Sequence, residues 1–434
     1  MARKGRTASR TQGFVAGSEK GQPCLKLGSA MRACGFLLVA FAFLPVCHAK
    51  SPHFEATKKI GVLCIGDTSY GESPILGWLS LDFAVQWQEL PTDVGDVMGD
   101  EAARKITRLY MPRTLDKLLE TYDFLLLLEP RMDWFSGTEM QRFKDSVNQG
   151  VSSLLTLWPD AEGYLSLVDS VLSEVYPQAF AANFESPSDS VAYRAVVNRN
   201  NPPVLTPFLA VGIEKFIGDD VRPVHPKLGS TIWAWAKKEG AVKVAEEPYI
   251  ISWEFGENEA ENWVIGVDVD EQWFGRSGGD EYGGDIILNM LYYSVGKPLP
   301  PSVELIHNVR SAFFTYSVEK RLVYAVLEFV DKFGASTVEL DRKIAQLDEG
   351  RDEAERAYME GDYEAAYNQA NAMIDELSKL NEEAVRIKDR ALLWVYATEW
   401  LAVSGTSILG GFILYSLMVR RRLYREVSVT RTNY

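Results

Sequence analysis

Residues 122–128, YDFLLLL, carry the strongest signal for the fold class of this chain. This stretch has no polar interruption after Asp123, so we expect a strand that is buried on both faces. Residues 60–65, IGVLCI, have the same character and are followed by a glycine and an aspartate. Strands that are covered on both faces occur in sheets with helices on either side. The two stretches therefore predict an α/β fold.

The segments around these two strands alternate between helix and strand patterns. Residues 106–120 have helical spacing, and residues 136–150 begin with the capping sequence SGTE and end at a glycine. The next strand is expected at residues 151–157. Strand, helix and strand in this order predict a doubly wound, mostly parallel sheet. Further strands are expected at residues 83–88, 192–197, 231–236, 249–253 and 263–267, and a closing helix at residues 282–295.

Three prolines, at positions 298, 300 and 301, mark the end of this domain. The following residues, to about Arg390, are charged helix formers with no strand pattern, and they predict helices at 314–333, 336–359 and 363–390. Residues 354–377 look like a single tetratricopeptide-type hairpin. One such unit cannot form a solenoid, because repeats need neighbours to bury their faces, so we interpret the region as an antiparallel helical stalk.

The N-terminal region has the layout of a secretory signal. A basic start at Arg32 precedes an apolar run at residues 33–46, and Cys47-His48-Ala49 is a small-x-small ending. We therefore expect cleavage before Lys50.

Two alternatives to a cleaved signal are less favoured. The apolar run is short for an uncleaved anchor, because a membrane span needs ~20 residues. In a lipoprotein signal ending at Cys47, Val46 is bulky where a small residue is expected. Translation starts either at Met1 or at Met31, since residues 1–30 are polar and featureless.

A second apolar segment lies near the C-terminus. The run from Trp400 to Val419 is uncharged, and its twenty residues at ~1.5 Å each can cross ~30 Å of hydrocarbon. Arg420, Arg421 and Arg422 follow at once, and positive residues stay on the cytoplasmic side. We expect a single-pass type I protein of the cell membrane, with its tail in the cytoplasm. A face made by Gly405, Gly410 and Gly411 suggests a helix–helix dimer through the span.

These signals divide the chain into five parts. They are an N-terminal extension with signal peptide (1–49), an α/β domain (50–298), a helical stalk (299–392), a transmembrane helix (393–419) and a basic tail (420–434). The formal net charge is -15 although both ends are basic, so the middle is strongly acidic. Phosphate binding relies on clustered Lys and Arg, which excludes nucleic acid as an expected partner. After processing, Cys64 is the only thiol, which excludes an internal disulfide.

The α/β region resembles the class I glutamine amidotransferase-like superfamily, which includes membrane-anchored relatives. The residues that carry the resemblance are YDFLLLL at 122–128, NQG at 148–150 with the strand after it, NPPVL at 201–205, and WVIGVD at 263–268 with the closing helix. The resemblance covers a little over half of the chain. It implies an amidotransferase/flavodoxin-like fold.

Active members of that superfamily use a cysteine at a sharp strand-to-helix turn, activated by a histidine and an acid. At the expected turn this chain has Leu157-Trp158-Pro159-Asp160, and at the place of the histidine it has Asp268-Val269-Asp270. Cys64 lies inside an apolar strand and is interpreted as a core residue. The resemblance therefore implies a catalytically degenerate member; we expect a non-enzyme, and an enzyme is the alternative.

Ligands of open parallel sheets bind beyond the carboxyl ends of the strands. The candidates there are Asp67 and Thr68 after the first strand, and Asp268, Asp270 and Trp273 after the last. Carboxylates two residues apart on an extended chain project to one side. Asp268 and Asp270 could bind Ca²⁺ or Mg²⁺, or they could act as a general acid and base pair. The third alternative is that they are solvated aspartates in a turn, with no role in a site. No resident cofactor and no zinc site are expected, because the histidines lack ligand spacing.

The leading hypothesis is a non-catalytic ligand- or protein-binding domain outside the cytoplasm, in a cell-envelope or transporter-associated assembly. An alternative is a divalent-metal-assisted envelope hydrolase that uses aspartates at the sheet edge. A third is a purely structural protein with a solvated acidic coat. The hydrolase hypothesis requires Asp67, Asp268 and Asp270 to converge on one pocket, whereas binding requires only an exposed groove or apolar patch.

Overall fold

The computed structural model describes residues 58–68, 74–93, 99–157, 161–180, 191–213, 215–218, 224–238, 247–267, 269, 273, 282–334 and 336–430. The expected signal peptide lies outside these residues.

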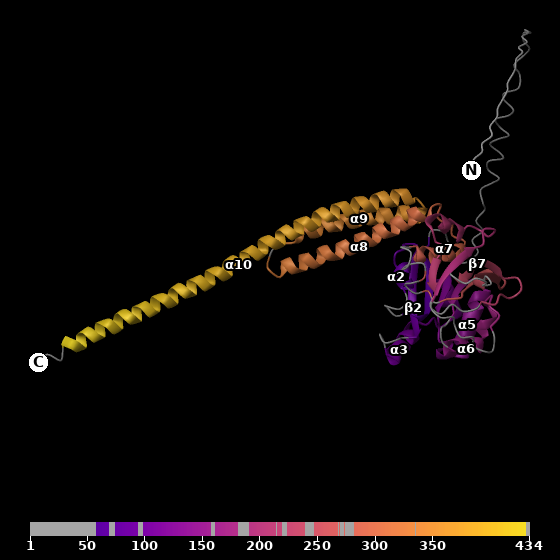
Figure 1. The fold of residues 1–434 in the computed structure, drawn as a ribbon, viewed down its shortest axis with the longest axis horizontal. Coiled ribbons are helices and arrows are strands. Elements are labelled where there is room, and N and C mark those ends of the chain that lie inside the picture. Colours follow the sequence, from indigo (N-terminus) through magenta and orange to yellow (C-terminus); the bar gives the residue numbers. More distant parts are fainter. Residues whose placement is uncertain are drawn as a thin grey trace, which may run out of the picture. The chain divides into compact units, whose positions relative to one another are not determined.

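Nine strands within the described residues form one sheet, in the order β2-β1-β3-β4-β9-β8-β7-β5-β6 (Figure 1). The first five of these strands are parallel, and their order is the 2-1-3-4-5 order of flavodoxin-like sheets. They are β1 (Ile60–Asp67), β2 (Val85–Asp93), β3 (Phe124–Leu128), β4 (Ser152–Thr156) and β9 (Ala260–Ile265).

The rest of the sheet is antiparallel. It consists of β5 (Val191–Val197), β6 (Lys215–Gly218), β7 (Thr231–Lys238) and β8 (Glu247–Phe255). The sheet is therefore mixed, and the expectation of a mostly parallel sheet was wrong for this half. The physical reason is the connections: within the described residues no α-helix stands between β5 and β9, and parallel pairing needs a long crossover.

β1 and β3 are buried on both faces, as the sequence predicted, and so are β4 and β9, whereas the edge strand β2 exposes Gln86. Side chains alternate across a strand, so Val62 and Cys64 enter one apolar core while Leu63 and Ile65 enter the other. The first core includes α2 (Ile75–Leu79) and α7 (Gly283–Val295). The second includes α4 (Leu115–Thr121), α5 (Gly137–Asn148) and α6 (Ala161–Val168), with the short 3-10 helices η2 (Met132–Trp134) and η3 (Val171–Glu174). A third short helix, η4 (Thr206–Val211), adds to the first core.

The single helix expected at residues 106–120 is two helices. α3 (Asp100–Tyr110) ends before Met111-Pro112, and α4 begins after Thr114, whose hydroxyl accepts a hydrogen bond from the Lys117 amide at 3.2 Å. Proline lacks an amide hydrogen and clashes with the preceding turn, so the helix breaks there.

Three long helices follow the α/β domain: α8 (Val303–Asp331), α9 (Val338–Glu360) and α10 (Tyr363–Thr430). They lie side by side in Figure 1 and bury a common apolar seam. α8 begins eleven residues before the expected position, because Ser302 caps it by accepting a hydrogen bond from the Leu305 amide at 3.2 Å. The seam includes Val323 and Leu327 of α8, Leu340 and Ile344 of α9, and Ala370 and Leu377 of α10.

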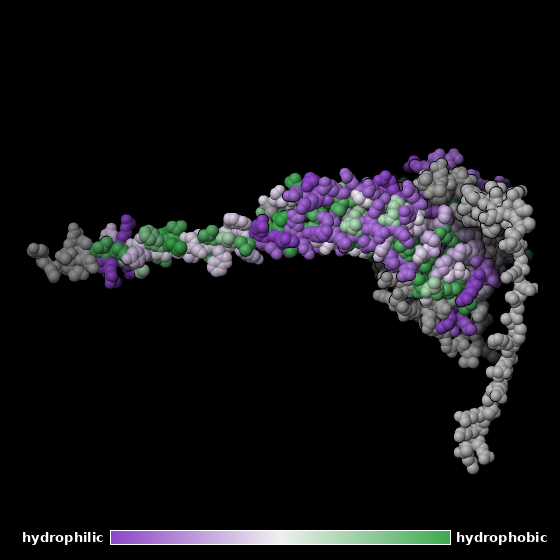
Figure 2. All heavy atoms as spheres, turned by 90° about the horizontal axis from the view of Figure 1, so that it is seen from above, coloured by the Kyte–Doolittle hydropathy of each residue, from purple (hydrophilic) through white to green (hydrophobic). Residues whose placement is uncertain are grey.

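α10 is one continuous helix of 68 residues. Its first part packs in the bundle, and its later part is long and apolar enough to cross a membrane, with none of its most apolar 18-residue window buried. Figure 2 shows green apolar side chains along this part, followed by purple hydrophilic ones near its C-terminal end.

Candidate functional site

The carboxyl edge of the parallel strands carries polar side chains that contact one another. The Thr92 hydroxyl accepts a hydrogen bond from the Arg131 amide at 2.9 Å, and the Thr156 hydroxyl accepts one from the Glu129 amide at 3.2 Å. Arg131 also forms ion pairs with Asp133 at 3.1 Å and Glu162 at 2.7 Å. These contacts join the ends of β2, β3 and β4.

Two backbone features at this edge depart from ordinary strand geometry. Glu129 has a φ of 48°, which is uncommon for a residue with a side chain. Gly66 has a φ of +126°, and a Cβ atom there would lie 1.7 Å from the Leu128 carbonyl oxygen. Glycine at position 66 thus lets β1 approach the end of β3 closely.

The candidate ligand-binding residues predicted from the sequence do not all lie at this edge among the described residues. Asp67 is half-buried at the end of β1, and Thr68 after it is buried. Trp273 is buried in the first core, where its indole nitrogen donates to the Tyr249 hydroxyl and its ring lies 6.5 Å from that of Trp78. Asp268 and Asp270 lie outside the described residues, as does the turn at 158–160. The metal-binding hypothesis for these aspartates stays a prediction.

Sequence reasoning missed Thr92, Glu129, Arg131 and Thr156. Each of these polar residues ends a strand or follows one, and the sequence can predict that position. The position identifies residues of one site only when the order and register of the strands are known, because the edge brings together segments that are distant in the sequence.

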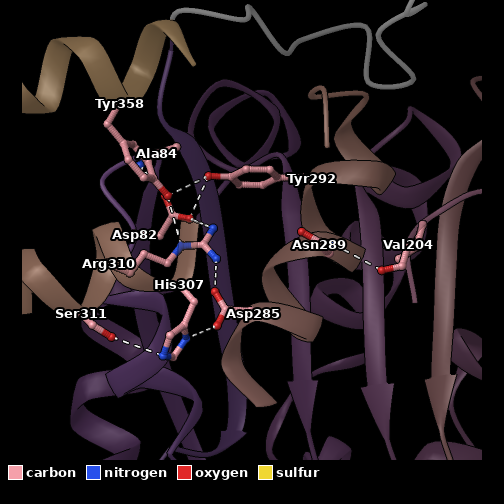
Figure 3. A network of polar contacts seen from close by, with 10 residues as sticks. All are labelled: Asp82, Ala84, Val204, Asp285, Asn289, Tyr292, His307, Arg310, Ser311 and Tyr358. Carbon is pink, nitrogen blue, oxygen red and sulfur yellow. Dashed lines mark hydrogen bonds and ion pairs between the residues drawn. The ribbon is translucent and has the colours of Figure 1, made fainter. Parts of the chain in front are cut away.

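A second polar cluster lies where the α/β domain meets the long helices (Figure 3). We call it the Arg310 network; its members are Asp82, Asp285, Tyr292, His307, Arg310 and Tyr358. Asp82 follows α2, and one of its carboxylate oxygens accepts a hydrogen bond from the Ala84 amide at 2.8 Å. Asp285 stands in the first turn of α7, where a negative charge suits the helix dipole.

Arg310 is the centre of this network. Its guanidinium donates to Asp82 and Asp285, and its Nε donates to the Tyr358 hydroxyl of α9 at 3.1 Å. Burial lowers the pKa of Arg310, but Tyr358, Asp82 and Asp285 raise it, and the result is a pKa well above the usual value. The side chain therefore stays charged and holds two buried carboxylates.

The remaining members complete the network. The Tyr292 hydroxyl donates to Asp82 at 2.8 Å, and His307 Nδ1 lies 2.7 Å from Asp285. His307 and Arg310 share a face of α8 because they are three residues apart. Burial raises the pKa of both Tyr292 and Tyr358, so both phenols remain protonated.

The geometry of the Arg310 network suits a structural joint better than a reaction centre. Its donors and acceptors face one another, and Asp82, Asp285, Tyr292, Arg310 and Tyr358 are buried. Cys64 is no alternative nucleophile, because burial, with a smaller effect of Glu89, raises the pKa of its thiol and disfavours the reactive thiolate. Within the described ranges no three His, Cys, Asp or Glu side chains are grouped to hold a metal ion.

Comparisons with known proteins add little to this geometry. No family model and no curated protein matches the chain. Among solved structures, the crystal structure of SMU.1228c is similar over 54% of this chain and 98% of its own, at 9% sequence identity and a TM-score of 0.29. At this score the likeness carries no argument about function.

Proposed function

We propose that this chain is a single-pass membrane protein whose α/β domain binds a partner protein outside the cytoplasm, as a subunit of a cell-envelope or transporter-associated assembly. The observation that carries the proposal is the connection between the domain and the long helices. The Arg310 network joins Asp82 and α7 to α8 and α9, and α10 then continues without a break into its exposed apolar part.

Such a connection favours a binding subunit over an independent enzyme. A domain joined to its anchor through buried ion pairs keeps a fixed position relative to that anchor, which is useful when a partner is in the same membrane. A soluble envelope substrate gives no reason for such a connection. The buried, protonated thiol of Cys64 also agrees with the interpretation of the α/β domain as a degenerate amidotransferase-like domain, which is part of this proposal.

The proposed orientation rests on the charges around the apolar segment. Arg420, Arg421, Arg422 and Arg425 follow it, and exposed aromatic residues, Trp394, Tyr396 and Trp400, precede or begin it. Aromatic side chains gather at membrane–water interfaces, and basic residues stay on the cytoplasmic side. The α/β domain then lies outside.

Site-specific photo-crosslinking of the full chain in its native membrane tests the binding function. A photoreactive residue at Glu162, beside the carboxyl edge, is expected to capture one partner protein of the envelope. The matched control is Glu257, which is exposed in the turn between β8 and β9, before the amino end of β9. Capture from neither position, or equal capture from both, contradicts the proposal.

The same preparation tests the hydrolase alternative. Turnover of an envelope substrate that is lost in Asp67→Asn, with unchanged thermal stability, would favour a hydrolase. Orientation is tested separately with a membrane-impermeant thiol reagent on intact cells. We expect labelling of Glu257→Cys and no labelling of Arg425→Cys; the opposite pattern would reverse the proposed topology.

A further inference from the structure

The turn between α8 and α9 exposes apolar side chains. We call residues 329–334 and 336–338 the α8–α9 tip. Phe329, Phe333 and Val338 are exposed there, Val338 to 74%, and the two phenylalanine rings lie 4.8 Å apart. Exposed apolar groups at the end of a charged helical bundle mark a surface that meets something other than water.

The α8–α9 tip lies against α10 just before the apolar segment. A groove of about 610 Å³ is lined by Phe333 and Gly334 of the tip and by Ile387, Arg390, Trp394 and Thr398 of α10. Trp394 is 67% exposed and stands six residues before Trp400, which corresponds to ~9 Å along the helix axis. The headgroup layer on each side of a bilayer is roughly 5–8 Å thick. Thr398, at the other end of the groove, stands two residues or ~3 Å before Trp400. The groove beside the tip therefore reaches into the headgroup layer when Trp400 begins the hydrocarbon core, and Trp394 lies at the outer boundary of that layer.

The chemistry of the tip and its surroundings suits lipid headgroups. Aromatic side chains prefer the interface, and the groove adds the guanidinium of Arg390, which can pair with lipid phosphate. Lys332 at the tip is a second cation, paired at 2.9 Å with Glu328. The combination of apolar, aromatic and basic groups is the one found on surfaces that lie in a membrane interface.

We propose that the α8–α9 tip docks onto the headgroup layer of the same membrane that α10 crosses. This inference rests on the proposed function, since it requires the apolar part of α10 to span the bilayer. The chain then has two contacts with the membrane, the span and the tip. Two contacts set the tilt of the bundle, and through the Arg310 network they set the height and direction of the α/β domain.

Nitroxide labelling of the full chain in phosphatidylcholine–phosphatidylglycerol vesicles tests the inference. The label is placed in turn at Val338→Cys in the tip, at Val318→Cys as the matched control, and at Leu409→Cys as an internal reference in the apolar segment. Val318 is also an exposed valine, on α8, and it lies ~22 Å farther from the membrane than Phe333. The measurement compares collisions of each label with oxygen and with a water-soluble nickel chelate.

We expect the label at Leu409 to favour oxygen strongly, the label at Val318 to favour the nickel chelate, and the label at Val338 to show an oxygen-to-nickel ratio several-fold above that at Val318. If the label at Leu409 is in lipid while those at Val338 and Val318 behave alike, the docking is overturned and the span stands. If the label at Leu409 is in water, the proposed span fails first. Dipolar coupling between Val338 labels of two chains, with shielding that persists without lipid, would assign the tip to a second copy and overturn the inference.

Discussion

Arg310 of α8 donates a hydrogen bond to Asp82, a residue 228 positions earlier in the chain. Both side chains are buried. The same guanidinium binds Asp285 of α7 and Tyr358 of α9, so one residue of the helical bundle holds two segments of the α/β domain and a neighbouring helix. The stability of the junction therefore depends strongly on this side chain.

Arg310→Met should destabilise the protein by about 3–5 kcal/mol, because it leaves two buried carboxylates without their cation. The measurement is the free energy of unfolding of the full chain in detergent, from urea titration. The control is Arg386→Met, which removes a side chain that is 76% exposed and pairs with Glu382 at 3.5 Å. That change should cost less than about 0.5 kcal/mol. Equal losses would mean that the network does not stabilise the junction.

Replacing the whole charge set tests the cause of that loss. The triple variant Asp82→Asn, Asp285→Asn, Arg310→Met removes the unpaired charges together with the cation. It should be more stable than Arg310→Met alone, because neutral amides are cheaper to bury than unpaired carboxylates. A triple variant less stable than the single one would point to lost packing as the cause.

Gly66→Ala should prevent correct assembly of the parallel strands. The added Cβ atom would lie 1.7 Å from the Leu128 carbonyl oxygen, and the φ of +126° is unfavourable for alanine. Strain of this kind costs roughly 1–3 kcal/mol before β3 is displaced. The control is Gly77→Ala in α2, where the added carbon meets no atom within 4 Å beyond its chain neighbours and the backbone of its own helix. Thermal unfolding should show a gain of up to about 1 kcal/mol for Gly77→Ala and a large loss for Gly66→Ala.

Cys64 should make stability depend on pH above the ordinary range of a thiol. Burial raises the pKa of Cys64 in the folded protein, so the folded state keeps a proton that the unfolded state releases above about pH 8.5. Its contribution to stability is complete below that pH and falls by about 1.4 kcal/mol per pH unit above it. Other buried groups, such as Tyr292, titrate at higher pH in both the parent and the variant.

The measurement compares the parent with Cys64→Ala between about pH 8 and 10. The variant has no thiol, so the gap in unfolding free energy between the two should narrow as the pH rises. If the unfolding free energies of the parent and of Cys64→Ala change in parallel with pH, the raised pKa of Cys64 is contradicted. As a separate check, iodoacetamide should modify the Cys64 peptide only after denaturation.

Ser136→Ala should destabilise the protein by about 1 kcal/mol. The Ser136 hydroxyl accepts a hydrogen bond from the Glu139 amide at 3.3 Å, and the Glu139 carboxylate accepts one from the Ser136 amide at 2.8 Å. The alanine loses half of this capping box. The control is Thr138→Ala. Thr138 is exposed in the first turn of α5, two residues after Ser136. This change should be neutral or slightly stabilising, because alanine has the higher helix propensity. A melting temperature lowered equally by both changes would contradict the capping role.

Local chemistry made much of the fold predictable. The uninterrupted apolar runs of β1 and β3 required burial on two faces, and the SGTE sequence predicted the start of α5, which the capping box confirms. The helix expected at residues 363–390 and the expected transmembrane helix at 393–419 both lie in the single helix α10. Pro112 is a helix breaker that the sequence displays. The helical spacing of the apolar residues in 106–120 nevertheless led to the prediction of a single helix.

Contacts between distant segments were not predictable in the same way. The Arg310 network joins residues from a loop and three helices, and no spacing in the sequence relates position 82 to position 310. The antiparallel half of the sheet had the same difficulty, since strand patterns predict strands but not their neighbours. At the carboxyl edge, Asp67 and Thr68 were placed by a general rule for parallel sheets, whereas Glu129 and Arg131 became visible only with the strand register.

The continuity of α10 has a rotational consequence. An α-helix turns by about 100° per residue, so the side of the helix that packs in the bundle and the side presented by the apolar segment keep a fixed phase. Insertion of one residue between Arg390 and Trp400 would turn the two ends by that angle relative to each other, while insertion of seven would restore the phase to within about 20°. The number of residues between the bundle and the apolar segment thus sets how the α/β domain is rotated about the axis of α10. A change of length there rotates the domain as well as moving it along the axis.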